Sequence, residues 1–136
     1  MSHRWVEHTG ELELEISASD ERAVFAEGFA AMRELLAGDG DSESAGAEPV
    51  TRAIELAGSD RAALLADWLA ELAVLGETEG LVPEGLRDLE LDAEGLRATI
   101  EGRTGSPSHL VKGATYHRLA FEPSADGWFA RVVLDV

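Results

Sequence analysis

The stretch Glu15-Ile16-Ser17-Ala18-Ser19-Asp20 returns forty residues later as Glu55-Leu56-Ala57-Gly58-Ser59-Asp60. Each copy ends an alternating apolar run, typical of a half-buried strand, and precedes apolar residues at helical three- and four-residue spacing. Ser19 offers an N-cap, and the acidic residues after it suit the positive end of a helix that runs to about residue 36. Strand, cap and helix are thus written twice, which predicts a duplicated β-α-β architecture.

Beyond Gly80 the pattern predicts strands alone. Alternating residues on either side of Asp92–Gly95 predict one hairpin. Residues 114–121 and 128–135 are expected to pair through 122–127 as a second hairpin, and residues 38–44 and 102–108 to form loops. Helices segregated from a mainly antiparallel set of strands give an α+β fold class. The length predicts one domain over residues 1–136.

Composition excludes several classes of protein. The chain has no cysteine, which rules out disulfides, thiolate metal sites and a cysteine nucleophile. No run approaches the ~20 apolar residues of a membrane span, so we expect a soluble, cytoplasmic protein without membrane contact. The net charge of −16 argues against direct binding of nucleic acid and favours a basic protein partner or divalent cations. A high-salt habitat or genomic base content are alternative origins of this acidity.

The stretch Val111-Lys112-Gly113-Ala114-Thr115-Tyr116-His117-Arg118-Leu119 holds the only lysine and the only tyrosine of the chain. Every other basic side chain, histidine apart, is arginine. Lysine presents a compact ammonium where arginine presents a planar fork, so Lys112 is a candidate functional cation. Chance retention is the alternative.

Few other residues suggest chemistry, because nucleophile elbows, phosphate loops and zincin helices are absent from the sequence. His8 and His117 are candidate bases or metal ligands, although a lone histidine is more often structural. Asp135 lies on an apolar strand, and Glu11 begins the first predicted strand. If they meet beside the terminal carboxylate at Val136, their hard oxygens suit Ca²⁺, Mg²⁺ or Mn²⁺ better than zinc. The alternative is that they lie apart.

Three blocks of the sequence carry a family resemblance. They are Glu7–Glu11, then Asp67–Leu72 with Thr78–Val82, and finally Val111–His117 followed by Trp128–Val136. Together they resemble the archease family, protein cofactors of the tRNA-splicing RNA ligase that joins 3′-phosphate or 2′,3′-cyclic phosphate ends to 5′-hydroxyl ends. The resemblance implies a duplicated β-α-β2 fold and a protein that is not itself an enzyme but promotes guanylylation and multiple turnover of the ligase.

The resemblance also implies roles for individual residues. Glu11, Asp135 and Val136 would hold a divalent cation, with Ca²⁺ expected ahead of Mn²⁺ or Mg²⁺. Glu11 stands where the family usually has aspartate, and the extra methylene suits flexible Ca²⁺ coordination better than strict octahedral Mg²⁺. Lys112 matches a family lysine implicated in acting on the ligase, and we group His8 and His117 with it as partner-activating residues.

Two other functions remain open from the sequence. One is a stand-alone metal-dependent hydrolase or transferase that uses His8 or His117 as its base. The other is a metal-free, chaperone-like module that binds proteins.

Overall fold

The computed structural model of the protein describes residues 1–37, 48–105 and 111–136. These residues form seven strands and two helices. In chain order the elements are β1 (Ser2–His8), β2 (Glu11–Ala18), α1 (Glu21–Ala37), β3 (Pro49–Ala57), α2 (Arg61–Glu79), β4 (Leu81–Asp92), β5 (Gly95–Thr104), β6 (Gly113–Ser124) and β7 (Gly127–Asp135). No helix in these ranges is long and apolar enough to cross a membrane.

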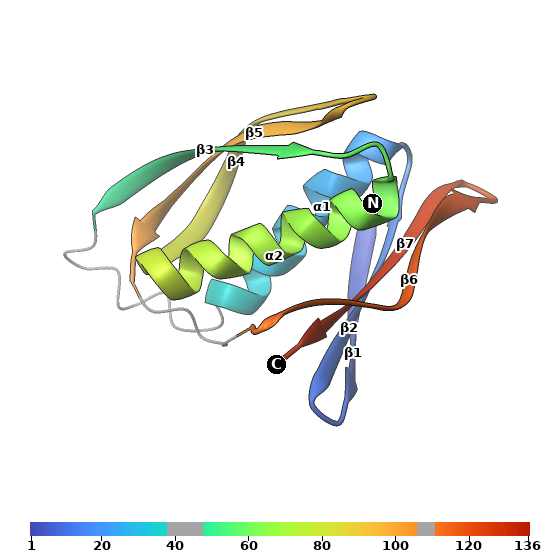
Figure 1. Ribbon diagram of the computed structural model, residues 1–136, viewed down its shortest axis with the longest axis horizontal. Coiled ribbons are helices and arrows are strands. Elements are labelled where there is room, and N and C mark those ends of the chain that lie inside the picture. Colours follow the sequence, from blue (N-terminus) through green and yellow to red (C-terminus); the bar gives the residue numbers. More distant parts are fainter. Residues whose placement is uncertain (38–47, 106–110) are drawn as a thin grey trace.

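The strands form two antiparallel sheets, in the orders β1-β2-β7-β6 and β3-β5-β4. The two helices pack against each other, and each contacts both sheets (Figure 1). The strand that begins each repeat pairs with a later hairpin: β2 with β7 of the β6–β7 hairpin, and β3 with β5 of the β4–β5 hairpin. The predicted α+β class, with two strand–helix repeats and antiparallel hairpins, is confirmed.

Apolar faces of the helices and sheets form the core, as the helical spacing predicts. Trp68 of α2 is fully buried, and its indole N–H donates to the carbonyl of Phe25 on α1 at 3.0 Å. This bond satisfies a buried donor that would otherwise destabilise the core. The other predicted inward residues of the two helices are also buried: Val24, Phe25, Phe29, Met32, Leu35, Leu36, Leu64, Leu65, Leu69, Leu72 and Leu75.

The helix caps correct the sequence prediction by one residue. Asp20, and not Ser19, caps α1, because its Oδ1 accepts the N–H of Ala23 at 2.8 Å. Asp60 caps α2 in the same way and accepts from Ala63 at 3.2 Å. A capping side chain reaches the amide three residues on, and the aspartates rather than the serines stand at that spacing.

Strand boundaries also depart from the sequence prediction. β1 was not predicted, because polar side chains on both faces hide its alternation, so Glu11 begins the second strand and not the first. β5 continues to Thr104, where a loop from residue 102 was expected. The β6–β7 strands extend to Ser124 and from Gly127, which shortens the expected turn. The predicted loop at 38–44 and residues 106–108 of the second loop lie outside the described residues.

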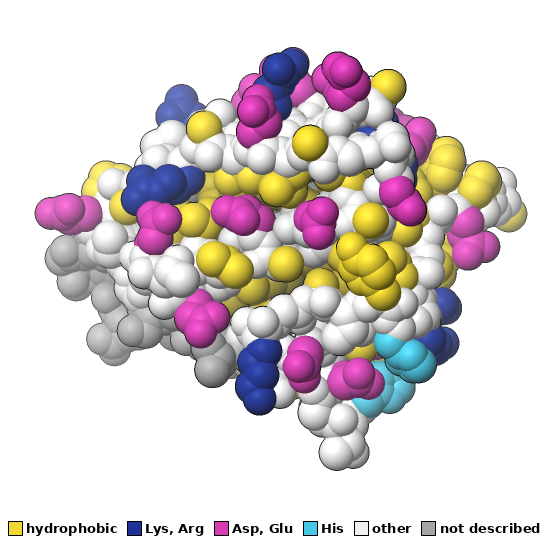
Figure 2. All heavy atoms as spheres, viewed as in Figure 1, with side chains coloured by type: hydrophobic (Ala, Val, Ile, Leu, Met, Phe, Trp, Pro, Cys, Tyr) yellow, Lys and Arg dark blue, Asp and Glu magenta, His cyan; other side chains and the backbone are white. Residues whose placement is uncertain are grey.

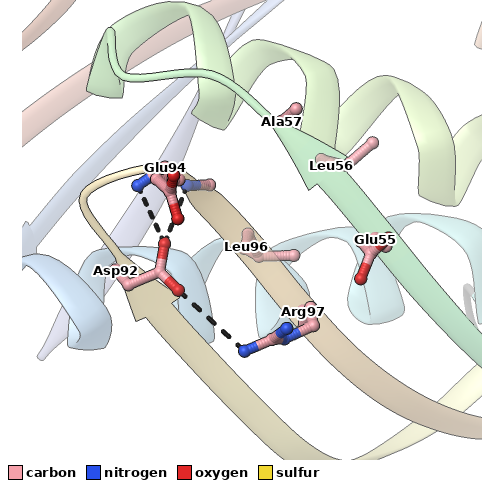
Figure 3. Close-up of a pocket in the computed structure, with 8 residues that line it drawn as sticks. Glu55, Leu56, Ala57, Asp92, Glu94, Leu96 and Arg97 are labelled. Atoms are coloured by element: carbon pink, nitrogen blue, oxygen red, sulfur yellow. Dashed lines mark hydrogen bonds and ion pairs between the residues drawn. The ribbon is translucent and has the colours of Figure 1, made fainter.

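Both hairpins are joined to their repeats by a close approach of backbone to glycine. A Cβ on Gly127 would lie 2.2 Å from the carbonyl oxygen of Ala18, and a Cβ on Gly95 would lie 2.1 Å from that of Leu56. Asp92 shapes the β4–β5 turn by accepting from the amides of Glu94 and Gly95 (Figure 3). No side chain fits at either glycine unless the strands separate.

These contacts allow the spacing of equivalent residues in the two strand–helix copies to be compared. The capping residues Asp20 and Asp60 are forty positions apart, whereas the strand ends Ala18 and Leu56, which meet the two glycines, are separated by thirty-eight. The link between strand and helix is therefore two residues longer in the second copy.

Gly127→Ala is expected to lower the free energy of unfolding by about 3 kcal/mol, since the methyl group overlaps backbone and the residue has φ 152°. Urea denaturation measures this change. Gly113→Ala is the matched control in the same hairpin, because a Cβ there meets nothing within 4 Å. Equal unfolding midpoints for the two variants would contradict the steric account.

A histidine links the edge strand β1 to α1. His3 Nδ1 lies 2.5 Å from Glu27 Oε2, and its Nε2 lies 3.3 Å from Glu34 Oε1. Burial of the ring opposes its charged form, but hydrogen bonds and charge from the two carboxylates outweigh burial and raise the pKa of His3 above its ordinary value of 6.5. The protonated ring therefore stabilises the β1–α1 contact.

The contribution of His3 to stability is expected to depend on pH. Because its pKa is higher in the folded protein, the stabilisation is complete below the unfolded value near 6.5 and is lost as pH rises through the folded pKa. Chemical denaturation of His3→Gln against the wild type should therefore show a larger loss at pH 5.5 than at pH 9. The Glu27→Gln variant should reduce this pH dependence, and an unchanged difference at the two pH values would refute the assignment.

Candidate functional site

Four strands meet at one end of the β1-β2-β7-β6 sheet. Across this end His8 pairs with Glu11, Glu11 with Asp135, and Asp135 with Gly113. Directly opposed residues of antiparallel strands face the same side of a sheet. The row therefore presents two carboxylates and one histidine on the face opposite to the core.

Backbone hydrogen bonds hold the neighbouring segments to this row. The N–H of Val136 donates to the carbonyl of Gly10 at 3.3 Å, and the N–H of Lys112 donates to the carbonyl of Asp135 at 2.8 Å. Gly10 has φ 74°, which suits the tight β1–β2 turn. Lys112 and Asp135 are exposed, and Glu11 and Val136 are half-buried. Near the C-terminus, basic, acidic and histidine side chains gather on the surface (Figure 2).

The donor atoms at this end fit a hard divalent cation in kind. Glu11 and Asp135 lie directly opposite each other, where two carboxylates repel unless a positive charge lies between them. Within the described ranges no three His, Cys, Asp or Glu side chains form a ligand cluster. A cation here would therefore need main-chain oxygen, with that of Val136 beside Gly10 as the candidate, and an all-oxygen set suits Ca²⁺, Mg²⁺ or Mn²⁺.

Glu13 follows Glu11 on the same face of β2, and its carboxylate is buried. Glu13 is 2% exposed and is the one charged side chain buried in the described part of the chain. Its Oε1 accepts from Arg118 Nη1 at 2.6 Å and lies 3.2 Å from His8 Nε2. Arg131 Nε lies 3.4 Å from Glu13 Oε2. Two arginines and a histidine thus compensate a carboxylate that burial would otherwise make costly.

Glu13 is covered because β6 carries extra residues. From Thr115 to Ala120 β6 advances five positions while β7 advances two, from Val133 to Arg131. The surplus forms a bulge, Tyr116–Leu119, which brings Arg118 to the carboxylate of Glu13. A pocket of about 140 Å³ lies at this point, lined by His8, Glu11, Glu13, His117, Arg118 and Val133.

The six residues singled out from the sequence thus lie in two adjoining groups. Glu11, Asp135, Val136 and Lys112 share the sheet end, and His8 and His117 line the neighbouring pocket with Glu11. Sequence reasoning missed Glu13 and Arg118, because alternation along β2 assigns Glu13 to the solvated face. The break in alternation at Tyr116–Leu119 was the available signal that β6 leaves the sheet there.

A larger hollow, of about 280 Å³, lies at the tip of the β4–β5 hairpin in the other half of the molecule. Glu55, Leu56 and Ala57 of β3 line it from the neighbouring strand (Figure 3). The Asp92 carboxylate in its wall is already engaged by turn amides. None of the charged residues that line this hollow belongs to the row across the four strands. We therefore place the candidate site at the end of the β1-β2-β7-β6 sheet.

Comparison with known proteins adds to this geometry. The sequence model of the Archease protein family (MTH1598/TM1083) matches residues 3–136. The chain belongs to the archease family. Protein archease of Methanosarcina acetivorans is 30% identical over 143 residues, which cover 98% of this chain and 95% of that protein. Protein archease of Archaeoglobus fulgidus is 28% identical over the full length of both chains.

Solved structures share the fold of this archease. The solution structure of Methanobacterium thermoautotrophicum protein 1598 superposes with a TM-score of 0.68 at 23% identity, covering 98% of each chain. A crystal structure from Thermotoga maritima, described as an archease and possible chaperone, superposes with a TM-score of 0.63 at 20% identity, covering 100% of this chain and 98% of that one. The family and fold expected from the three sequence blocks are confirmed.

Proposed function

We propose that this archease is a protein cofactor of the tRNA-splicing RNA ligase and promotes guanylylation and multiple turnover of that enzyme. The observation that carries the proposal is the sheet end where Glu11, Asp135 and the backbone of Lys112 and Val136 meet. Two of the three blocks that resemble archease motifs supply these residues, namely Glu7–Glu11 and Val111–His117 with Trp128–Val136. The description of the Thermotoga maritima relative as a possible chaperone agrees with action on another protein.

Charge suggests how the sheet end acts. The chain carries a net charge of −16, which favours rapid encounter with a basic surface of the ligase. Lys112 is an exposed cation whose backbone N–H bonds the carbonyl of Asp135, and a triphosphate oxygen or a ligase carboxylate is its natural complement. A divalent cation held by Glu11, Asp135 and the oxygen of Val136 would add positive charge at the sheet end. The cation and Lys112 together would orient reacting groups in the ligase.

The histidines of the site favour a cofactor role over an independent hydrolase. His8 Nε2 lies 3.2 Å from Glu13 Oε1, so its ring is held by a structural carboxylate rather than by a nucleophile. His117 is exposed on the bulge, where it is available to a partner. We therefore assign His8 a supporting role within this archease and His117 a place on the surface that the ligase contacts.

The deciding experiment joins RNA that carries a 3′-phosphate and a 5′-hydroxyl, using a small amount of ligase and an excess of RNA. With this archease present, each ligase molecule should join many RNAs, and without it about one. Archease alone should join none. A ligase that turns over equally well without this protein would contradict the proposal, and joining or nucleotide hydrolysis by archease alone would favour an enzyme.

Asp135→Asn is expected to weaken Ca²⁺ or Mn²⁺ binding by about tenfold or more, because it removes one of two carboxylate ligands while preserving side-chain shape. Titration calorimetry measures the affinity. Asp126→Asn, which changes an exposed carboxylate at the opposite end of the β6–β7 hairpin, is the matched control. If Asp135→Asn binds these cations as tightly as the control, the cation assignment is wrong.

Lys112→Ala is expected to fold and bind cations normally but to reduce ligase activation by about tenfold or more, as for loss of a charge-assisted contact worth ~1.5–3 kcal/mol. Lys112→Arg separates two roles, since a purely electrostatic one survives and one that needs a compact donor does not. Arg87→Ala, which removes an exposed cation of the other sheet, controls for net charge. Full activation by Lys112→Ala would show that Lys112 has no part in activation.

A further inference from the structure

The Tyr116–Leu119 bulge is held in a conformation that needs outside support. Arg118 has φ 57° and is the one non-glycine residue with positive φ in the described ranges. The left-handed region is unfavourable for a side chain such as arginine. Strained backbone of this kind persists when surrounding contacts determine it, so the cause must lie in what Arg118 touches.

The support comes from Glu13. Its carboxylate is buried beneath the bulge and accepts from Arg118 Nη1 at 2.6 Å. Arg131 and His8 hold the same carboxylate from β7 and β1. Glu13 thus occupies a fixed position, and Arg118 is drawn back onto the sheet while the preceding residues are turned outward.

The residue turned outward is an aromatic one. Tyr116 is 64% exposed, whereas Phe25 and Trp68 are fully buried. The hydroxyl of Thr115 accepts the N–H of His117 at 3.2 Å, which further shapes the turn after Tyr116. An exposed tyrosine on a preset backbone loses little conformational freedom on binding and is typical of interface hot spots.

Position and charge indicate the partner. Tyr116 follows Gly113, the residue opposite Asp135, by three positions, or about 10 Å of extended strand. A macromolecule that reaches Lys112 and Asp135 would therefore also reach Tyr116. The chain as a whole carries a net charge of −16, so a partner surface that complements it is basic, with an apolar recess for the ring.

We infer that Tyr116 is an anchor residue of this archease, which inserts into an apolar recess within a basic surface of the ligase, and that Glu13 is a positioning residue that presents Tyr116 through Arg118. The inference rests on the proposed function, because the partner is the same ligase. It adds a binding contact separate from Lys112 and the carboxylates. Lys112 would act on the reacting groups, whereas Tyr116 supplies affinity.

The test measures the dissociation constant of archease and ligase, together with multiple turnover. Tyr116→Ala should weaken binding by about tenfold or more, and activation should recover at high archease concentration because the activating residues remain. Val74→Ala is the matched control, since Val74 is exposed on α2 and is 46% accessible, and it should bind as the wild type does. Tyr116→Ala that binds as tightly as the control would overturn the inference.

A double-mutant cycle separates positioning by Glu13 from a general effect on stability. Glu13→Gln should weaken ligase binding when Tyr116 is present and should change it little in the Tyr116→Ala background, because the contact it positions is then missing. Equal losses in the two backgrounds would overturn the positioning role. If the wild type binds and activates the ligase but these variants do so equally well, this inference alone fails. A wild-type protein that does not activate the ligase contradicts the proposed function, and the inference with it.

Discussion

The pairing of β2 with β7 is the constraint on which the rest of the structure depends. It joins the second strand of the chain to the last and sets Glu11 opposite Asp135. At the far end of the same pair Gly127 meets the carbonyl of Ala18 so closely that no Cβ fits. A slip of one residue would turn each side chain to the other face and would place a larger residue against that carbonyl. Backbone packing at one end of the pair thus fixes which carboxylates meet at the other.

The same register explains why a carboxylate is buried outside the core. Glu13 faces Val133, next to the point where β6 leaves the sheet. Burial of a charge costs more than surface ion pairs return unless several partners compensate it, and here Arg118, Arg131 and His8 do so. Such a cluster adds little net stability compared with apolar packing. Its effect is on conformation, because it selects one path for the strained residues of β6.

Local patterns predicted much of this fold, and non-local geometry accounts for what they missed. Alternation identified β2 and both hairpins, and helical spacing identified the inner faces of α1 and α2, because periodicity follows burial directly. β1 was missed because an edge strand needs no clean alternation. Glu11 and Asp135 were candidates from their places on the predicted strands and from the family resemblance, whereas Glu13 looked solvated. Its burial depends on how many residues β6 uses against β7, a count that no single segment contains.

The second copy of the repeat shows that the fold does not require the site. The two copies can be aligned by matching the contact of Gly127 with Ala18 to that of Gly95 with Leu56. In this alignment Pro49 corresponds to Glu11, and Arg103, which pairs with Pro49, corresponds to Asp135. Leu81, which is buried, corresponds to the exposed Lys112. Equivalent strand ends therefore close with two carboxylates and a lysine in one half and with proline, arginine and leucine in the other. Because the second half closes an equivalent strand end without these polar residues, the fold does not require them, and their presence in one copy alone argues for a function at that end.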